Sequence, residues 1–352
     1  MNRYFKNMES NVHYFLPNIN KNVNKNKNMN KKISKIVSSH FFTNNEIINV
    51  NKIRHINNYK NHYYVFTNAK KLQITHVEDD VEPIYVKNAN SILLQFDDIP
   101  IIHLNNYLET LSSSRKCIFQ LLEFYRHILQ SINLLSDNKI VHNNIHFESI
   151  IINNDEIPLL TNFLFSIDIS KPECIKHLLT EYKPSYISWP IEFHMLAYML
   201  TNKLDSLSSF NIEKIIDDVS GANHILNTFG ETLVTSYKTD AYEYFKKYVN
   251  HSYEFIVTDI LQFYKTWDNY ALSIMYLSIF IGIHKSSQMT NEQKQGNKFI
   301  IMFMKLLVSN ISVNPQNRSS IGLTINNFEN MIYSLQSKDY KDIINKLDLM
   351  FA

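Results

Sequence analysis

The first hundred residues carry a pattern of apolar and polar positions that favours strands. The run YYVFT from Tyr63 and the run KLQIT from Lys71 are rich in β-branched and aromatic residues, which predicts two strands joined by a short polar turn. The EDDVEP segment that follows predicts a loop. SILLQF, from Ser91, predicts another strand, and DDIP directly after it predicts a linking segment. This β-rich part is therefore expected to end near Pro100.

Beyond Pro100 the pattern changes to helical spacing. Residues 118–135 place apolar side chains three and four positions apart, which predicts an amphipathic helix. The run TWDNYALSIMYLSIF, from Thr266, predicts a helix that is apolar on all sides and therefore buried in a core. Its apolar portion, residues 270–283, is too short to cross a bilayer and is bordered by Asp268 and His284, so we reject a membrane helix.

Two segments of this later part combine apolar runs with a polar centre. In IVHNNIHFESIII, from Ile140, apolar runs flank a polar loop, and in PLLTNFLFSIDI, from Pro158, a strand-like run leads into a polar turn. This order is typical of a protein kinase catalytic loop followed by its metal-binding turn, so the chain resembles the eukaryotic-type protein kinase superfamily. The matching positions are His142, Asn143 and Asn144 for His-Arg-Asp, His146 and Ser149 for the later Lys and Asn, and Asn162, Phe163 and Leu164 for Asp-Phe-Gly.

The resemblance implies that the groups of phosphoryl transfer have been substituted. The loop Asp of a kinase accepts the proton of the substrate hydroxyl, which the amide of Asn144 cannot do near neutral pH. Loss of a general base usually costs about two to four decades of rate. Asn162 offers magnesium a neutral carbonyl where a carboxylate is preferred, and Ser149 offers only a hydroxyl as a weak ligand. His146 replaces a lysine with a side chain that is mostly uncharged near neutral pH.

The distribution of glycine points in the same direction. The chain contains five glycines, and the first of them is Gly221, so no G-x-G-x-x-G loop lies upstream of the catalytic-loop segment. Glycine is used in phosphate cradles because backbone amides can approach a phosphate closely where no side chain intervenes. The cradle is therefore missing, whichever way the two motifs are aligned.

The residues that hold a kinase together are retained, according to the same resemblance. NEIINVNKI, from Asn45, resembles the helix that carries the ion-pair glutamate, and Asp268 is expected to accept hydrogen bonds from the catalytic-loop backbone. SWPIEFH resembles the end of the activation segment, and its glutamate is expected to pair with the arginine of NPQNRSS. The structural framework implied is Glu46, Val50, His142, Phe163, Glu192, Asp268 and Arg318. Alternatives are an exposed glutamate at a helix start for Glu46 and a surface arginine for Arg318.

The chain begins with a segment rich in Asn and Lys. We interpret residues 1–35 as a disordered polar segment; the alternative is a basic arm for nucleic acid or for a particle partner. No aromatic residues interleave the basic ones of NINKNVNKNKNMNKK, which argues against a platform for single strands. The lysine that pairs with Glu46 is expected in or just after this segment. Its candidates are Lys27, Lys31, Lys32 and Lys35.

The resemblance predicts an α+β, two-lobed, kinase-like fold. We expect a small β-rich N-lobe over residues 36–100 and a large, mainly helical C-lobe over residues 101–352. Glu192 and Asp268 are much farther apart than in ordinary kinases, and the runs NIEKIIDDV, AYEYFKKYV and VTDILQFY predict a helical insertion at about residues 200–262. It either covers the lobe or forms a docking surface for a partner. We reject IEFHMLAYML as the central helix because Arg318 would then lie too far downstream.

Other chemistry finds less support. His142 and His146 are four apart, but no third ligand is spaced for zinc, so we expect no metal site. Glu148 and Asp168 are the carboxylates nearest the substituted positions, and a displaced catalytic base is an alternative interpretation. Cys117 and Cys174 form no metal or redox motif, which fits a reducing compartment.

Charge and the start of the chain add two expectations. The formal net charge of +2 predicts no strong attraction to nucleic acid or to an anionic membrane. No apolar core segment follows the first residues, so we expect no secretory signal.

A narrower resemblance concerns WPIEFH, DNYALSIMYL and the HNNI-x-F of the loop. These segments look like the divergent kinase-like proteins of large nucleocytoplasmic DNA viruses, over about residues 44–330. The resemblance implies a viral protein of the host cytoplasm or the virion, with unidentified protein partners. We expect an inactive pseudokinase that acts as a binding or scaffold module without a cofactor. Alternatives are an atypical active Ser/Thr kinase, which would use ATP and magnesium, and a structural component of the virion.

Overall fold

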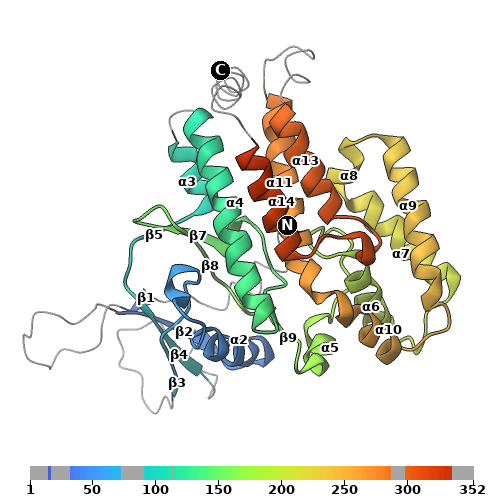
Figure 1. The fold of residues 1–352 in the computed structure, drawn as a ribbon. Helices are drawn as coiled ribbons and strands as arrows, with labels where there is room; N and C mark the ends of the chain where they lie inside the picture. The colour runs from blue at the N-terminus through green and yellow to red at the C-terminus, as the bar shows by residue number, and fades with distance from the viewer. Residues whose placement is uncertain (1–14, 17–31, 73–90, 112–113, 287–297, 335–352) are drawn as a thin grey trace, which may run out of the picture.

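The protein has an α+β fold in which most strands precede most helices (Figure 1). The computed structural model describes residues 15–16, 32–72, 91–111, 114–286 and 298–334. Within these residues, no helix combines the length and the apolar character needed to cross a membrane. The predicted EDDVEP loop and most of residues 1–35 lie outside the described part of the chain.

A four-stranded antiparallel sheet opens the fold. Its strands are β1 (Phe15–Leu16), β2 (Lys32–Ser38), β3 (Asn68–Leu72) and β4 (Ser91–Asp97), in the spatial order β1-β2-β4-β3. The strand predicted from Ser91 is thus confirmed as β4, and it pairs with β2 from Lys32 opposite Asp97 to Ser38 opposite Ser91. The boundary that we expected at residue 35 is wrong, because β2 already begins at Lys32.

Helix α2 (Phe41–Ile53) follows β2, and its buried Val50 and Ile53 belong to the same apolar core as Ile92 and Leu94 of β4. It begins earlier than the run NEIINVNKI suggested, because the ring of His40 caps the helix by accepting a hydrogen bond from the Thr43 N–H at 3.3 Å. Glu46 therefore lies in the second turn and is half-buried, which rules out the alternative of an exposed glutamate at the helix start.

The run YYVFT does not form the predicted strand. Tyr63 makes only an isolated bridge with Leu160. Strand β3 covers residues 68–70, which we expected to be a turn, together with Lys71 and Leu72 of the predicted KLQIT strand; the rest of that run lies outside the described residues. The apolar residues of the run are buried for another reason: this segment anchors the sheet to the helical part. The Tyr63 hydroxyl donates to the Ser131 carbonyl at 2.6 Å, and the Tyr64 N–H donates to the Leu160 carbonyl at 2.9 Å.

Two further small sheets carry the segments that resemble the kinase loop and turn. Strands β5 (Ile101–His103), β7 (Ile150–Asn153) and β8 (Pro158–Leu160) form an antiparallel sheet in the order β5-β7-β8. Strand β6 (Ile140–Val141) pairs with β9 (Ile167–Asp168). Residues 142–149 run between β6 and β7, and residues 161–166 run between β8 and β9, so the two pairings bring both segments to one place.

Helices make up most of the remaining described chain. Residues 118–135 lie inside α4 (Ser114–Asp137), and the core helix predicted from Thr266 is α11 (Trp267–Ser286), so both predictions are confirmed. The others are α3 (Leu104–Thr110), α5 (Ile175–Leu178), α6 (Ile191–Asn202), α7 (Ser209–Ala222), α8 (His224–Thr228), α9 (Glu231–Phe245), α10 (Tyr253–Ile260), α13 (Lys298–Asn310) and α14 (Ile321–Tyr333).

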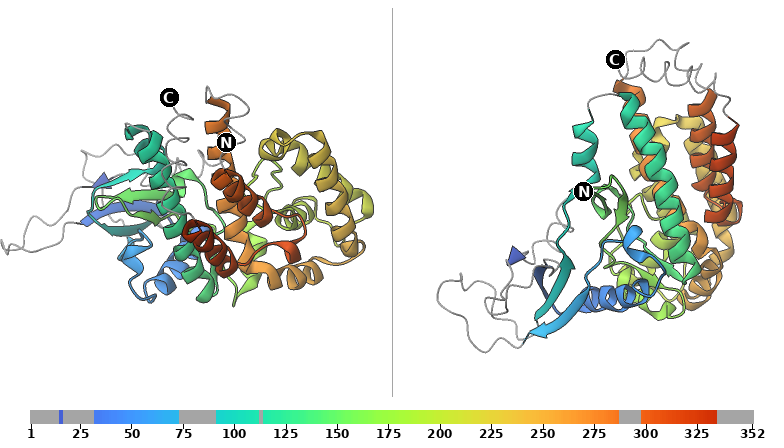
Figure 2. Two further views of the ribbon diagram at one scale, coloured as in Figure 1. Left: turned by 45° about the horizontal axis from the view of Figure 1, so that its top comes forward. Right: turned by 60° about the vertical axis from the view of Figure 1, so that its left-hand side comes forward.

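The predicted insertion is helical, as expected, and consists of α7 to α10. Helices α7, α8 and α9 lie at the opposite end of the molecule from the four-stranded sheet, with α4 and α11 between them (Figure 1, Figure 2). Buried Trp267 at the start of α11 belongs to a core with α6, α7 and α10, whereas later residues of α11 belong to a second core with α4, α13 and the sheet. Helix α11 therefore joins the two cores.

The junction between the sheet and α4 predicts a dependence of stability on pH. The rings of His62 and His127 stack with centroids 4.9 Å apart, and His62 Nδ1 lies 2.9 Å from the Ser131 hydroxyl. Burial, together with the nearby His127, lowers the pKa of His62 to about 4. Because the unfolded chain binds this proton at a higher pH, the free energy of unfolding should fall as the pH drops from about 6.5 toward 4.

Urea unfolding of wild type and of His62→Gln at a series of pH values measures this effect. The variant should show a pH slope that is shallower by up to roughly one proton in this window. His224→Gln, at an exposed position, is the matched control and should retain the wild-type slope. Equal slopes for wild type and His62→Gln would contradict the assignment.

Candidate functional site

The backbone of the loop that follows β6 is fixed by one buried carboxylate. Asp268, in the first turn of α11, accepts the His142 N–H at 2.7 Å and the Asn143 N–H at 2.9 Å, one with each oxygen. Burial raises the pKa of Asp268 to about 6, although the two backbone donors act in the opposite direction. Asn143 has a left-handed backbone with φ of 57°, a conformation that Asn tolerates better than most residues. The hydrogen bonds predicted for Asp268 are therefore present.

The ring of His142 connects the loop to the turn. Its Nδ1 accepts the Asn144 N–H at 3.3 Å, so its Nε2 carries the proton and donates to the Thr161 carbonyl at 3.0 Å. Burial lowers the pKa of His142 to about 3, which keeps the ring neutral. The Phe163 ring meets the His142 ring edge-on with centroids 4.7 Å apart, and it also contacts Tyr63. Phe163 and Tyr63 belong to the same buried apolar cluster as the fully buried Val50.

Helix α2 holds the turn through polar contacts. Glu46 Oε1 accepts the Phe163 N–H at 3.2 Å, and the Asn45 amide donates to the carbonyls of Leu164 at 3.0 Å and Ser166 at 2.8 Å. Asn49 adds a bond to the Ser166 carbonyl at 3.2 Å. The sequence interpretation missed Asn45 and Asn49; their only signal was two amides four positions apart on the helix, a spacing that places them on one face.

Of the two candidate lysines that the structure describes, Lys35 lies near enough to Glu46 for its charge to affect that carboxyl. Burial raises the pKa of Glu46, and the positive charge of Lys35 on β2 opposes this effect. Lys32 instead forms an ion pair with Asp97. Lys27 and Lys31 lie outside the described residues.

Asn144 is engaged by a tyrosine that the sequence interpretation did not identify. The Tyr186 hydroxyl donates to Asn144 Oδ1 at 2.5 Å, and Trp189 Nε1 donates to the Asn143 carbonyl at 3.1 Å. The two aromatic rings meet edge-on, 4.8 Å apart. Asn144 itself is buried, and its Nδ2 has no hydrogen-bond partner within the described residues. Tyr186 and Trp189 therefore cover the loop at Asn143 and Asn144.

The polar side chains of Ser149, His146 and Asn162 lie beside the same loop and turn. The Ser149 hydroxyl accepts the His146 N–H at 2.9 Å and donates to the His146 carbonyl at 2.8 Å, so both of these hydrogen bonds are made within its own loop. The His146 ring accepts the Glu148 N–H at 3.2 Å, and burial lowers its pKa. Asn162 has φ of 64°, and its buried Oδ1 has no partner among the described groups. One neutral oxygen fits the charge demand of magnesium poorly.

The nearest carboxylates are not placed as a substitute base. Asp168 pairs with Lys52, and its other oxygen accepts the Ser170 N–H at 3.1 Å and the Ser170 hydroxyl at 2.5 Å. Burial raises the pKa of Asp168, but these hydrogen bonds outweigh it and leave the pKa below its ordinary value. Glu148 is exposed to solvent. In the part of the chain that the structure describes, no three His, Cys, Asp or Glu side chains converge.

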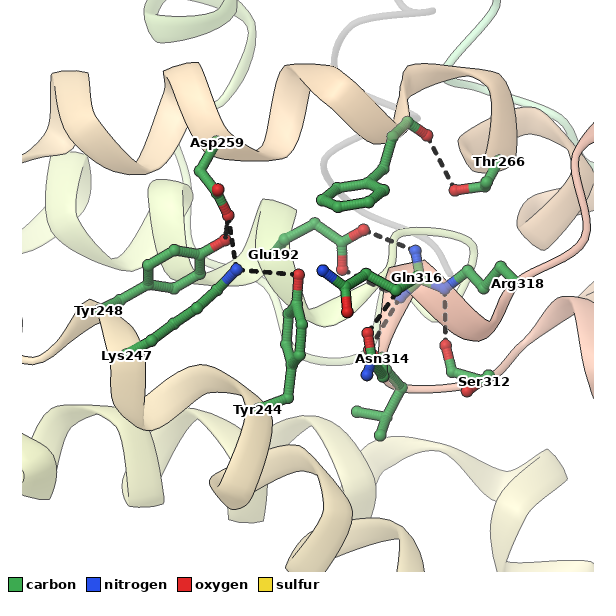
Figure 3. A network of polar contacts seen from close by, with 12 residues as sticks. Glu192, Tyr244, Lys247, Tyr248, Asp259, Thr266, Ser312, Asn314, Gln316 and Arg318 are labelled. Carbon is green, nitrogen blue, oxygen red and sulfur yellow. Dashed lines mark hydrogen bonds and ion pairs between the residues drawn. The ribbon is translucent and has the colours of Figure 1, made fainter.

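The predicted pair between Glu192 and Arg318 is also present, and it is bidentate (Figure 3). The Arg318 Nη1 lies 2.6 Å from Glu192 Oε1, and Nη2 lies 3.0 Å from Oε2. The side chains are 1% and 0% exposed, which rules out a surface arginine. Arg318 also donates to the carbonyls of Ser312 at 2.6 Å and Val313 at 3.2 Å, and its guanidinium lies over the Tyr270 ring. The pair thereby ties α6 and α11 to the segment before α14.

No protein-family model matches the chain, and no curated protein matches it.

Removal of the Asp268 carboxylate tests how strongly it holds the loop. In Asp268→Ala, two buried backbone N–H groups lose their acceptor, and each such loss typically costs about 1–3 kcal/mol. We expect the free energy of unfolding, measured with urea, to fall by roughly 2–5 kcal/mol in total. The exposed Asp205→Ala is the control and should change stability by less than about 0.5 kcal/mol. Similar values for both variants would contradict the anchoring role.

A double-mutant cycle on Glu192 and Arg318 tests the buried pair. Either single change, Glu192→Gln or Arg318→Met, leaves an uncompensated buried group and should cost about 3–5 kcal/mol. The double variant should cost clearly less than the sum, because no unpaired charge remains. Chemical unfolding of all four proteins gives the coupling energy; additive losses would contradict a direct interaction.

Proposed function

We propose that this chain is a kinase-like protein that does not transfer phosphate and acts as a binding or scaffold module. Three contacts support the kinase-like part of the proposal. Asp268 holds the loop backbone, the ring of His142 contacts that of Phe163, and Glu46 of α2 bonds the backbone of the turn while Lys35 lies close enough to act on its charge. The resemblance named Glu46, His142, Phe163 and Asp268 as framework residues, and for Asp268 it specified hydrogen bonds from the loop backbone.

One observation carries the inactive part of the proposal. The position of the catalytic carboxylate is held by Asn144, and the hydroxyl of Tyr186 already occupies its side-chain oxygen at 2.5 Å. An acceptor hydroxyl would have to bind at this same atom to lose its proton. Tyr186 therefore stands where a substrate hydroxyl would be, opposite a group that cannot act as a base.

A second candidate is an atypical Ser/Thr protein kinase that uses ATP and magnesium. It is favoured by the retained coupling of Lys35 and Glu46, because that pair positions nucleotide phosphates in active kinases. The metal side of such a site is weaker, since the single oxygen of Asn162 is neutral. We rank this candidate second for that reason.

The setting of the proposed scaffold follows from the resemblance alone. It implies a viral protein of the host cytoplasm or the virion, whose partners are proteins. A structural role in the particle is a variant of the same proposal, and detection at high copy number in purified particles would distinguish it from a role in host signalling. The near-neutral formal charge of +2 gives no reason to prefer nucleic acid as the partner.

Phosphate transfer and nucleotide binding test the proposal together. Incubated with radiolabelled ATP and magnesium, the protein should label neither itself nor casein. A ligand that binds only the folded state raises the melting temperature of a protein. We expect no nucleotide to bind, so the melting temperature should stay unchanged on addition of millimolar ATP and magnesium.

The two readouts separate the candidates. Magnesium-dependent labelling that is lost in Asn144→Ala or Asn162→Ala would refute the inactive assignment. A thermal shift that is lost in Lys35→Ala, without any labelling, would leave the protein inactive but would add nucleotide binding to its properties. Asn154→Ala, at an exposed turn position between β7 and β8, serves as the matched control.

A further inference from the structure

A pocket of about 600 Å³ lies between the insertion and the C-terminal helices. One wall is the face of α9 that carries Leu233, Tyr237 and Tyr244, and the other is formed by the end of α13 and residues 311–317. The volume lies within the range of about 300–1,000 Å³ typical of ligand pockets. We name this site the α9–α13 groove.

The α9–α13 groove has a fixed inner wall. Arg318, held by Glu192, donates to the carbonyls of Ser312 and Val313, which belong to the lining of the groove. On the opposite side, the Lys247 ammonium donates to the Tyr244 hydroxyl at 3.0 Å and pairs with Asp259 at 2.7 Å (Figure 3). The groove is therefore formed by the folded protein and does not depend on an occupant for its shape.

Apolar side chains form both the buried base and the exposed edges of the α9–α13 groove. Leu226, Ile311 and Val313 form the base and are buried, whereas Leu233 and Val308 stand on opposite walls and are 39% and 36% exposed. Exposed aliphatic side chains that face each other across a groove are typical of a helix-binding or peptide-binding surface.

The charge of the lining selects the chemistry of the occupant. The charged side chains among its lining residues are Asp240 and Glu243, both on α9 and both exposed, whereas the Lys247 ammonium that bonds Tyr244 is already paired with Asp259. Glu243 pairs with Lys246, whereas Asp240 forms no ion pair with any residue that the structure describes. An occupant that inserts apolar side chains and presents Lys or Arg beside Asp240 complements both features.

We propose that the α9–α13 groove is the docking site for a protein segment that carries apolar side chains at helical spacing and a flanking Lys or Arg. The inference deepens the proposed scaffold function. It rests on that function in one respect, namely that the partner is a protein. It assigns a binding surface to the insertion, far from the loop and turn. Its outcome is separate from that of the phosphate-transfer assay, which probes a different part of the molecule.

A peptide library provides the test. Phage that display random 16-residue peptides are selected on the immobilised full chain, and the affinities of the enriched peptides are measured by fluorescence anisotropy. The enriched sequences should share two or more apolar residues at i, i+3 or i, i+4 and a nearby Lys or Arg. Leu233→Asp and Val308→Asp, on opposite walls, should each weaken binding at least about tenfold, because each places a charge in the apolar groove.

A charge reversal adds a readout that loss of folding cannot imitate. Asp240→Lys should weaken binding about three- to fivefold, and a peptide with its Lys replaced by Glu should bind this variant better than it binds wild type. Phe210→Asp, at a residue of α7 that is 70% exposed and outside the groove, should retain full affinity. The proposal is refuted if no peptide is enriched, if enriched peptides lack the basic residue, or if binding survives both wall variants in proteins with wild-type melting temperatures.

Discussion

The structure depends first on the contact between the Asp268 carboxylate and the two backbone N–H groups at the start of the loop. A buried carboxylate is costly unless hydrogen bonds satisfy it, and here those bonds also fix the backbone that carries His142 and Asn144. The neutral His142 ring then positions the turn by donating to the Thr161 carbonyl and by contacting the Phe163 ring. The Phe163 N–H in turn bonds Glu46, which connects the turn to α2. The geometry of the loop and the turn is thus maintained by hydrogen bonds to the backbone and by contacts between buried rings.

The helical segment α7 to α10 also contributes to the buried surroundings of the Glu192–Arg318 pair. The hydroxyls of Tyr237 from α9 and Tyr270 from α11 interact, and both rings lie close enough to Glu192 and Arg318 for their charges to affect the two phenols. Burial is the main cause that raises the pKa of Tyr237 well above its ordinary value, so its hydroxyl stays protonated. The insertion therefore completes the burial of this ion pair. It covers the helical core and, with the face of α9 that carries Tyr237, also forms one wall of the α9–α13 groove, so the two roles that the sequence left open are compatible.

The sequence predicted those elements whose pattern is decided locally. The core helix α11, the amphipathic α4 and strand β4 follow from spacing within one segment. The strand predicted for YYVFT is absent because this segment is buried through contacts with the distant residues Ser131 and Leu160. A segment buried in this way has the same apolar and aromatic composition as a strand. The contacts of Asp268 and the Glu192–Arg318 pair were expected only through the resemblance. The role of Tyr186 could not be predicted from the sequence, because its hydroxyl bonds Asn144, which lies 42 residues earlier in the chain.

An experimental structure determined with magnesium and a non-hydrolysable ATP analogue tests the central claim most directly. The account predicts that the Tyr186 hydroxyl remains on the Asn144 oxygen and that no metal ion is bound between Asn144 and Asn162. A bound nucleotide with magnesium coordinated at Asn162, together with displacement of Tyr186 from Asn144, would contradict it.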